Sequence, residues 1–267
     1  MEYRAHPSDF PAVFQEDWGH VAGKLKHAIS AEARLRRDLC AAGRELRELG
    51  FLPAASGNLS VRLADGRILA TPAGAMKGRL APGELIRLHA DGAPERGAGR
   101  KDAGRRASSE MAVHLRIYAL RPEVRAICHA HPPVATGFAA AGRSLDSATL
   151  GEAAVLLGAV PLAPYGAPGT EELADSIVPF VKRANAVLLA NHGVVTFAED
   201  LRTAVQRMEM VDHCARVLLV AELAGGAKLL TRAQIRRLVE SRARYGLPPL
   251  PANAIPWVVA DEPGRKR

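Results

Sequence analysis

Two histidines at the end of an apolar segment have the residue types and spacing of half a metal site. Residues 124–131 are mostly apolar and end at Pro132-Pro133, which a strand cannot continue through, so a strand is predicted here. Side chains two residues apart in a strand point to the same face, which places His129 and His131 side by side. Neutral imidazole is a good ligand for zinc and similar divalent ions. The pair alone is a weak signal, because such a short motif also occurs by chance.

Two further residues could complete such a site. His192 lies between two apolar segments and precedes Gly193, so its side chain is expected at a turn between two strands. A histidine that only bonds the turn backbone is the alternative. Glu110 is expected in the first turn of a helix, where it either complements the helix dipole or, beside a divalent cation, takes and gives protons. Three other histidines, on predicted helices or at a strand end, are less suggestive: His114, His213 and His89.

Small polar residues at three places could hold an anionic group of a substrate. Residues 108–109 are serines before a predicted helix, whose free N–H groups favour phosphate. The turns at 56–60 and 71–74 contain glycine, which allows a close backbone approach to an anion. The alternative is that these are ordinary turns, which are rich in the same residues. These three segments are therefore candidates for an anion-binding surface.

Hydrophobic periodicity predicts helices and strands that alternate along the chain. Asp65-Gly66 between two strand-like segments indicates a hairpin, and Asp200 is expected to cap a long helix. Helices are predicted over residues 31–49, from a serine cap at 108–109 to 120, from Thr170, over 201–224 and over 233–245. Strands are predicted over residues 59–63, 67–71, 85–88, 124–131, 159–163, 186–190 and 194–197. This order indicates an α/β fold in which a mixed sheet carries helices on both faces.

The composition is that of an ordinary globular protein of 267 residues. We expect an N-terminal extension over residues 1–30, a main domain over 31–226, and a C-terminal helix with a Pro-rich tail over 227–267. The sequence contains no long apolar span and does not begin like a signal peptide. Three scattered cysteines are typical of reduced thiols. A cytoplasmic protein without a membrane partner is therefore expected.

The net charge of +8 raises the question of nucleic-acid binding. Much of the positive charge lies in a Gly/Arg-rich stretch at 96–106 and in the C-terminal residues 264–267. Aromatic residues make up only 4% of the chain and are not interleaved with the basic segments, so no stacking surface for bases is predicted. We expect solvated basic segments and no nucleic-acid partner, and the charge could instead attract an anionic small substrate.

Taken in order, the candidate motifs resemble the class II aldolase/adducin family over about residues 31–224. Six motifs in the same order make a chance resemblance improbable, although each alone is common. The motifs are Ser56-Gly57-Asn58-Leu59-Ser60, Thr71-Pro72-Ala73-Gly74, Ser108-Ser109-Glu110, His129-Ala130-His131, Ala163-Pro164-Tyr165 with Gly169-Thr170, and Asn191-His192-Gly193.

The resemblance implies a three-layer α/β/α fold with a mixed, largely antiparallel central sheet, and a cyclic homotetramer with active sites at subunit interfaces. It implies zinc, or another divalent ion such as manganese or cobalt, as the cofactor. It implies metal ligation by His129, His131 and His192. It also implies phosphate binding by the small residues Gly57, Asn58, Gly74, Ser108 and Ser109. It also implies two catalytic residues, Glu110 and a Tyr165 delivered from the neighbouring subunit as an acid.

The implied activity is aldol cleavage of a ketose 1-phosphate, similar to L-fuculose 1-phosphate, into dihydroxyacetone phosphate and an aldehyde. Three histidines leave a divalent ion with open positions, as a catalytic site requires. One departure concerns the phosphate: Ala73 stands where the family type has a hydroxyl residue. Lys77 could compensate with its charge, or it could be a solvated surface side chain.

Other reactions of the same family remain open. Relatives epimerise pentulose phosphates, with an aspartate near the position of Glu110, dehydrate methylthioribulose phosphate, or decarboxylate sugar acids. Glutamate at 110 favours the aldolase over the epimerase. An adducin-like interaction module without activity is the alternative from a different class, although such a module needs no histidine and glutamate cluster.

Overall fold

The computed structural model describes residues 31–95, 105–146, 148–251, 253–254 and 256–258. Its centre is a seven-stranded sheet with the order β3-β2-β1-β4-β7-β6-β5. Neighbouring strands are antiparallel except β5 and β6, which are parallel. The strands are β1 (Asn58–Arg62), β2 (Ile68–Ala70), β3 (Ile86–Leu88), β4 (Ala126–Ala130), β5 (Leu162–Ala163), β6 (Ala186–Leu189) and β7 (Gly193–Ala198). The predicted mixed, largely antiparallel sheet is confirmed.

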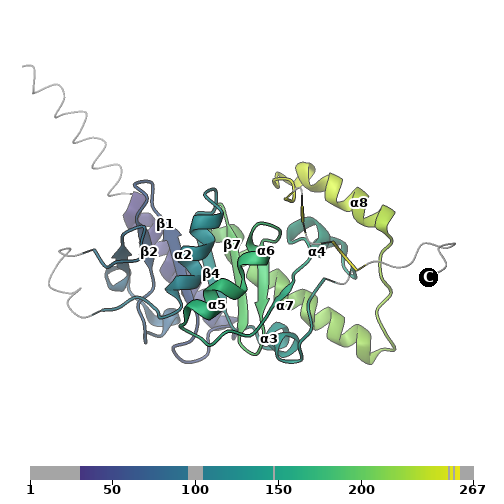
Figure 1. Ribbon diagram of the computed structural model, residues 1–267, viewed down its shortest axis with the longest axis horizontal. Coiled ribbons are helices and arrows are strands. Elements are labelled where there is room, and N and C mark those ends of the chain that lie inside the picture. Colours follow the sequence, from purple (N-terminus) through teal and green to yellow (C-terminus); the bar gives the residue numbers. More distant parts are fainter. Residues whose placement is uncertain (1–30, 96–104, 147, 252, 255, 259–267) are drawn as a thin grey trace, which may run out of the picture.

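Helices cover both faces of this sheet and make three layers (Figure 1). One face packs against the helical residues 31–48, α3 (Pro133–Ala140) and α7 (Leu201–Leu223). The other face packs against α2 (Met111–Leu120), α5 (Glu171–Ser176) and α6 (Val178–Val181). The α/β/α expectation is therefore confirmed.

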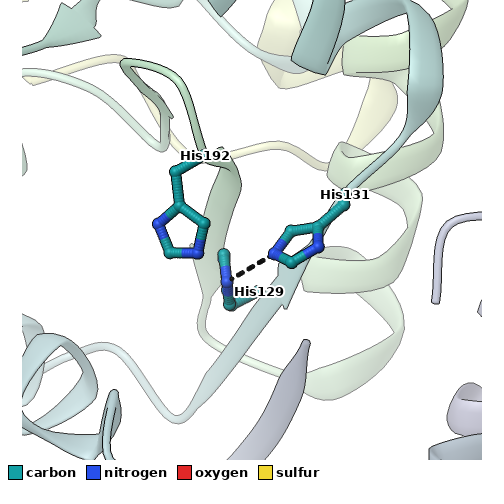
Figure 2. Close-up of side chains that lie close together, drawn as sticks. All are labelled: His129, His131 and His192. Atoms are coloured by element: carbon teal, nitrogen blue, oxygen red, sulfur yellow. Dashed lines mark hydrogen bonds between the residues drawn. The ribbon is translucent and has the colours of Figure 1, made fainter. Parts of the chain in front are cut away.

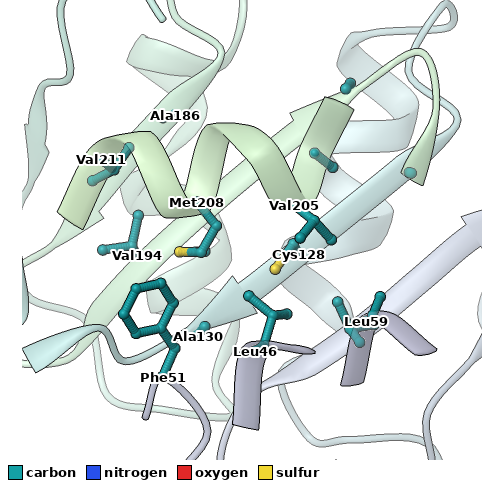
Figure 3. Close-up of a cluster of buried hydrophobic side chains, with 14 of the residues drawn as sticks. Leu46, Phe51, Leu59, Cys128, Ala130, Ala186, Val194, Val205, Met208 and Val211 are labelled. Carbon is teal, nitrogen blue, oxygen red and sulfur yellow. The ribbon is translucent and has the colours of Figure 1, made fainter. Parts of the chain in front are cut away.

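Alternation along β4 assigns its side chains to the two layers. Cys128 and Ala130 belong to the core that contains α7, whereas Ile127 belongs to the core that contains α2. Figure 3 shows the first core, where Leu46 and Met208 from different helices meet the β4 side chains. Burying each such large apolar side chain stabilises the fold by about 1.5–3 kcal/mol. By the same alternation, the side chain of His129 lies on the α2 side of the sheet, near the start of that helix.

The start of α2 corrects the prediction that residues 108–109 cap it directly. The helix begins at Met111, and Glu110 occupies the N-cap position without a capping side-chain bond. The reason is a turn before the helix: the Met111 N–H donates to the Ser108 carbonyl at 3.0 Å, and the Glu110 N–H donates to Ser108 Oγ at 3.3 Å. The Glu110 side chain is thereby left available for other partners.

Two other predicted elements are shorter than expected. The strand predicted over 159–163 reduces to β5, because Val160 pairs instead with Leu145 in an isolated bridge. The helix predicted over 233–245 divides into α8 (Arg232–Glu240) and the 3-10 helix η4 (Ser241–Tyr245). The caps expected from Thr170 and Asp200 are present, since each side chain accepts an N–H three residues on.

The C-terminal part packs as an addition to the main domain. Ile235 of α8 joins a small core with Ala154 of α4 (Gly151–Leu156). We propose the domain boundary near residue 226, because α7 ends at two glycines with φ of 105° and 110°. The proposed extension 1–30 and most of the Gly/Arg-rich stretch lie outside the described residues. Among the helices of the described part, none combines the length and apolarity that a membrane span requires.

Candidate metal and catalytic site

The three candidate histidines come together at one end of the sheet (Figure 2). His129 is the second-last residue of β4, His131 lies just beyond its end, and His192 lies in the turn between β6 and β7. Pairing of β4 with β7 brings these distant segments side by side. The three ring centroids are 4.8–5.1 Å apart, and one nitrogen of each ring lies within 4.8 Å of the others. The histidines can therefore share one metal ion.

Glu110 lies against the same group of nitrogens. Its Oε1 is 2.9 Å from His192 Nε2, and its Oε2 is 3.2 Å from His129 Nε2. Burial opposes ionisation of this carboxyl, but its contacts with His129 and His192 outweigh burial and hold the pKa of Glu110 below its usual range. The N-cap position of Glu110 thus places an ionised carboxylate, which can accept a proton, beside the histidines.

His129 and His131 can each offer a lone pair to a metal. His129 Nδ1 is 2.9 Å from the Val194 carbonyl, which only accepts, so Nδ1 carries the proton and Nε2 is the nitrogen that can bind a metal. Burial, followed by the neighbouring histidines, lowers the pKa of His131 to about 3, so this ring is neutral at physiological pH. His129 Nε2 and His131 Nε2 are only 3.1 Å apart. A divalent cation can replace the protons that such close nitrogens and carboxylate oxygens would otherwise share, so this donor set fits a metal.

Asn58 links the glutamate to the expected phosphate-binding turn. It lies opposite His129 in the pairing of β1 with β4. Its Nδ2 donates to Glu110 Oε2 at 2.8 Å and to Ser108 Oγ at 3.2 Å. Its Oδ1 is buried without a hydrogen-bond partner. The structure therefore brings together four of the expected site residues: Asn58, Ser108, Glu110 and His129.

Backbone bonds hold the three expected phosphate-binding segments next to one another. The Leu59 N–H donates to Thr71 Oγ1 at 3.1 Å, which joins the first turn to the second. The Ala73 N–H donates to the Arg106 carbonyl at 2.9 Å, which joins the second turn to the segment before Ser108. The segments can therefore form one anion-binding surface, with backbone N–H groups and the serine hydroxyls as donors.

Gly57 and Gly74 have the backbone conformation that favours glycine. Their φ angles are 66° and 68°, in the left-handed region. A Cβ at Gly57 would also lie 2.4 Å from the Leu52 side chain and 2.6 Å from the His129 carbonyl oxygen. Any larger residue at 57 would therefore disturb the end of β4. Ser109 packs closely as well, because a Cβ at Gly169 would come within 2.9 Å of its hydroxyl oxygen.

Lys77 is a functional candidate for which the sequence left two interpretations open. The solvated alternative is wrong, since Lys77 is only 3% exposed. Its Nζ donates to the carbonyl of Ala55, just before the Gly57 turn. Burial lowers the pKa of Lys77, and the charge of Glu110 opposes this shift. Among the described residues no carboxylate lies within ion-pair distance of it, so a buried cation is available to an anionic ligand.

His114 was not distinguished by its sequence, yet it lies beneath the site. It is fully buried, and its Nδ1 is 2.7 Å from Ser60 Oγ, which is 2.9 Å from the Tyr118 hydroxyl. Burial lowers the pKa of His114 to about 3, so the ring is neutral. It lines the same small pocket as Glu110 and His192. A lone histidine on a helix has no sequence signal that would reveal this position.

Tyr165 is not part of the cluster within this chain. It follows β5 and is 55% exposed. No hydrogen bond of the described residues connects its hydroxyl to the histidines or to Glu110.

Replacing Gly193 by alanine is expected to disturb metal binding. The added Cβ would lie 2.5 Å from His131 Cδ2 and 2.7 Å from the Ala130 carbonyl oxygen, so ring and strand must both shift. Overpacking of this kind costs about 1–3 kcal/mol of stability. Thermal unfolding and metal titration should show a lower midpoint and weaker metal affinity. Gly137→Ala in α3, where a Cβ meets nothing within 4 Å, is the control and should leave both unchanged or slightly raise stability. Equal metal affinity in Gly193→Ala would contradict the expectation.

Comparison with known proteins agrees with this geometry. The model of the Class II Aldolase and Adducin N-terminal domain matches residues 37–219. The 3-oxo-tetronate 4-phosphate decarboxylase of Pectobacterium atrosepticum is 31% identical over 198 residues, covering 72% of this chain and 87% of that protein. The L-fuculose phosphate aldolase of Escherichia coli is 28% identical, covering 80% and 96%. A solved structure of L-fuculose 1-phosphate aldolase has a TM-score of 0.71 at 28% identity, covering 79% and 96%.

The matched region spans more than half of the chain and contains the whole cluster around Glu110. Two independent features therefore agree, the order of the motifs and the three-layer fold that brings them together. The resemblance inferred from the motifs is confirmed: this chain belongs to the class II aldolase and adducin family.

Proposed function

We propose that the protein is a metal-dependent carbon–carbon lyase that acts on a phosphorylated sugar or sugar acid. The observation that carries this proposal is the Glu110 carboxylate in contact with His129 and His192 and held by Asn58. His129, His131 and His192 would hold the ion, with zinc as first choice and manganese or cobalt as alternatives. Such an ion would act as a Lewis acid that polarises a substrate carbonyl.

The residues of this chain would bind the substrate and move one proton. Glu110, which is ionised at rest, would take a proton from solvent onto a carboxyl oxygen and deliver it to the substrate carbon that loses its bond, or run these steps in reverse. Asn58 Nδ2 would keep Glu110 Oε2 in place. The phosphate would be bound at the surface formed by Gly57, Asn58, Gly74, Ser108 and Ser109, with Lys77 close by.

Aldol cleavage of a ketose 1-phosphate is the first candidate reaction. The bond between the carbon next to the carbonyl and the hydroxyl-bearing carbon breaks. The hydroxyl loses its proton and becomes an aldehyde, and the other carbon gains a proton from Glu110 to give dihydroxyacetone phosphate. We propose that Tyr165 of a neighbouring subunit passes the substrate's hydroxyl proton to solvent. Tyr165 is 55% exposed, so its side chain can reach the site of another subunit.

Decarboxylation of a 3-oxo sugar-acid phosphate is the second candidate. It is favoured by the 31% identity to a 3-oxo-tetronate 4-phosphate decarboxylase. Here the bond to the carboxylate carbon breaks, carbon dioxide leaves, and the remaining carbon gains a proton. Both reactions develop negative charge on a carbon next to a carbonyl, so they need the same proton donor and the same cation.

A substrate panel tests the proposal and separates the two reactions. The protein would be assayed with ketose 1-phosphates, their unphosphorylated analogues and 3-oxo sugar-acid phosphates. Dihydroxyacetone phosphate would be measured by a coupled reductase, and carbon dioxide would be measured separately. Product from phosphorylated substrates that disappears with a chelator and returns with a divalent ion supports the proposal. Activity that survives complete metal removal, or no product from any substrate, would contradict it.

Lys77→Met is expected to weaken binding of the phosphorylated substrate. A charge-assisted hydrogen bond contributes about 1.5–3 kcal/mol, so KM should rise at least ~10-fold. The turnover number should change less, and KM for an unphosphorylated analogue should hardly change. Lys228→Met, at an exposed lysine, is the matched control. A purely structural Lys77, which only holds the Ala55 carbonyl, would instead lower the thermal midpoint and affect both substrates equally.

We also propose a cytoplasmic, cyclic homotetramer in which Tyr165 completes the site of the next subunit. The exposure of Tyr165 and its separation from the cluster support this arrangement. Tyr165→Phe and Glu110→Gln should each lose activity as homotetramers. Mixed tetramers from coexpression should regain up to about a quarter of wild-type activity, because one site in four then combines two intact residues. Light scattering should give four subunits, and a monomer or the absence of complementation would contradict the arrangement.

A further inference from the structure

A large cleft lies at the end of the sheet opposite to the histidines. Asn185 precedes β6 and Glu199 follows β7, and both line this cleft, whereas His192 lies in the turn at the other end of the same strands. Arg121 follows α2, whose opposite end carries Glu110. The cleft has a volume of about 910 Å³, and part of its lining comes from residues 246–249, 251 and 253. It is therefore separate from the proposed active site.

Buried arginines supply unused hydrogen-bond donors at this cleft. Arg207 of α7 lines it and is only 4% exposed. Its Nη1 donates to the Phe197 carbonyl at 2.5 Å, but its Nε is buried without a partner. Arg242 is 2% exposed and lies behind the same wall, since its Nε donates to the Pro248 carbonyl at 2.8 Å. Its Nη2 is likewise buried without a partner. Unpaired buried donors on cations are costly, and an anion bound at Arg207, which of these two arginines is the one that lines the cleft, would offset its unbalanced charge.

The charges around the cleft are not balanced by its own carboxylates. Among the described residues, Glu123 and Glu199 are the acidic side chains that line it. Glu123 is paired with Arg121. Glu199 Oε2 is 3.7 Å from Arg207 Nη2, a long contact. Exposed Lys182 adds another positive charge at the rim. An excess of positive charge therefore remains for a ligand.

The shape and lining of the cleft indicate the class of ligand. Guanidinium groups bind phosphate and carboxylate oxygens through paired donors, and Asn185 adds a polar group at the floor. Apolar side chains also line the cleft: Leu120, Leu247 and, in the stretch called here the proline wall, Pro248, Pro249 and Pro251. We propose that this cleft, named here the arginine cleft after Arg121 and Arg207, binds a small organic phosphate, with its anionic group at Arg207 and its carbon skeleton against the proline wall.

Calorimetric titration with phenyl phosphate tests the proposal. The proposed active site also binds phosphate, so the titration uses the full chain with Asn58→Ala and Lys77→Met, which weaken that site. One equivalent of phenyl phosphate per chain is expected to bind, more tightly than inorganic phosphate because of the apolar wall. Adding Arg207→Leu should weaken binding at least ~10-fold, since charge-assisted hydrogen bonds are lost. Because binding and not turnover is measured, failure of the proposed lyase activity would leave this test intact.

Two further variants keep the test decisive. Lys182→Glu, at an exposed rim position, should weaken binding several-fold and decides the question if Arg207→Leu does not fold. Arg202→Glu changes an exposed arginine of α7 that does not line the cleft, and it should bind like the parent. The proposal is overturned if the parent variant gives no more heat than a sodium chloride control. It is also overturned if folded Arg207→Leu, or Lys182→Glu in its place, binds unchanged.

Discussion

Glu110→Gln is expected to remove most turnover while the fold and the bound metal remain. Glutamine has the same shape and keeps an oxygen that can accept from Asn58 Nδ2, which is 2.8 Å from Glu110 Oε2. It cannot take or give a proton at neutral pH. Loss of a positioned acid–base group lowers the rate by about 10²–10⁴-fold. Steady-state kinetics on the best substrate of the panel, with metal content measured on the same sample, checks this expectation.

The control for Glu110→Gln is the same substitution at a glutamate outside the site. Glu240→Gln changes an exposed residue at the end of α8 and should retain full activity. Glu110→Gln should lower the turnover number and leave KM nearly unchanged, because the phosphate contacts are not altered. Near wild-type cleavage by Glu110→Gln would show that another group moves the proton, and the catalytic role proposed for Glu110 would be wrong.

His192→Ala is expected to abolish stoichiometric metal binding. Wild-type protein should contain about one divalent ion per chain, because three imidazoles can be shared by one ion. The variant retains only His129 and His131 as ligands. It also leaves Glu110 Oε1 without its contact at 2.9 Å to His192. Metal that binds only the folded state stabilises it by about 2.7 kcal/mol at a hundredfold excess over Kd. Elemental analysis, and thermal unfolding with and without added zinc, should show that the variant loses both the ion and this stabilisation.

His213→Ala is the matched control, since His213 lies exposed on α7 away from the cluster. It should keep one ion per chain and the metal-dependent shift of the thermal midpoint. A wild-type protein that is folded, stable and free of metal even after exposure to zinc, manganese and cobalt would favour the interaction module over the enzyme. The experiment therefore distinguishes the two classes of function as well as the ligand set.

The histidine pair shows how far local spacing can predict a site. The alternation of side chains along a strand predicts that His129, in β4, and His131, one residue beyond its end, lie on one face, and this period is a property of any strand. The Asp65-Gly66 hairpin and the caps of Thr170 and Asp200 were predictable for the same reason. Each depends on the backbone conformation of a few consecutive residues. Such features are encoded within a short segment.

The residues that surround the histidines could not be predicted from local sequence patterns. The N-cap position of Glu110 depends on a turn that Ser108 closes, and the cap predicted at 108–109 was one to two residues too early. Lys77 looked like a surface lysine, but packing of its loop against the helical residues 31–48 buries it. His114 of α2 had no sequence signal, because its surroundings depend on Ser60 from strand β1. These positions result from contacts between segments that are far apart in the sequence.

The amino-acid sequence alone therefore determined the family, the sheet and the identity of the cluster residues, since these follow from residue type, order and short-range periodicity. Only the tertiary structure decided that Glu110 contacts His129 and His192, that Lys77 is a buried cation, and that arginines meet at the opposite end of the sheet. The physical reason is that burial and electrostatic environment are set by every segment that packs around a side chain, and no local pattern records them.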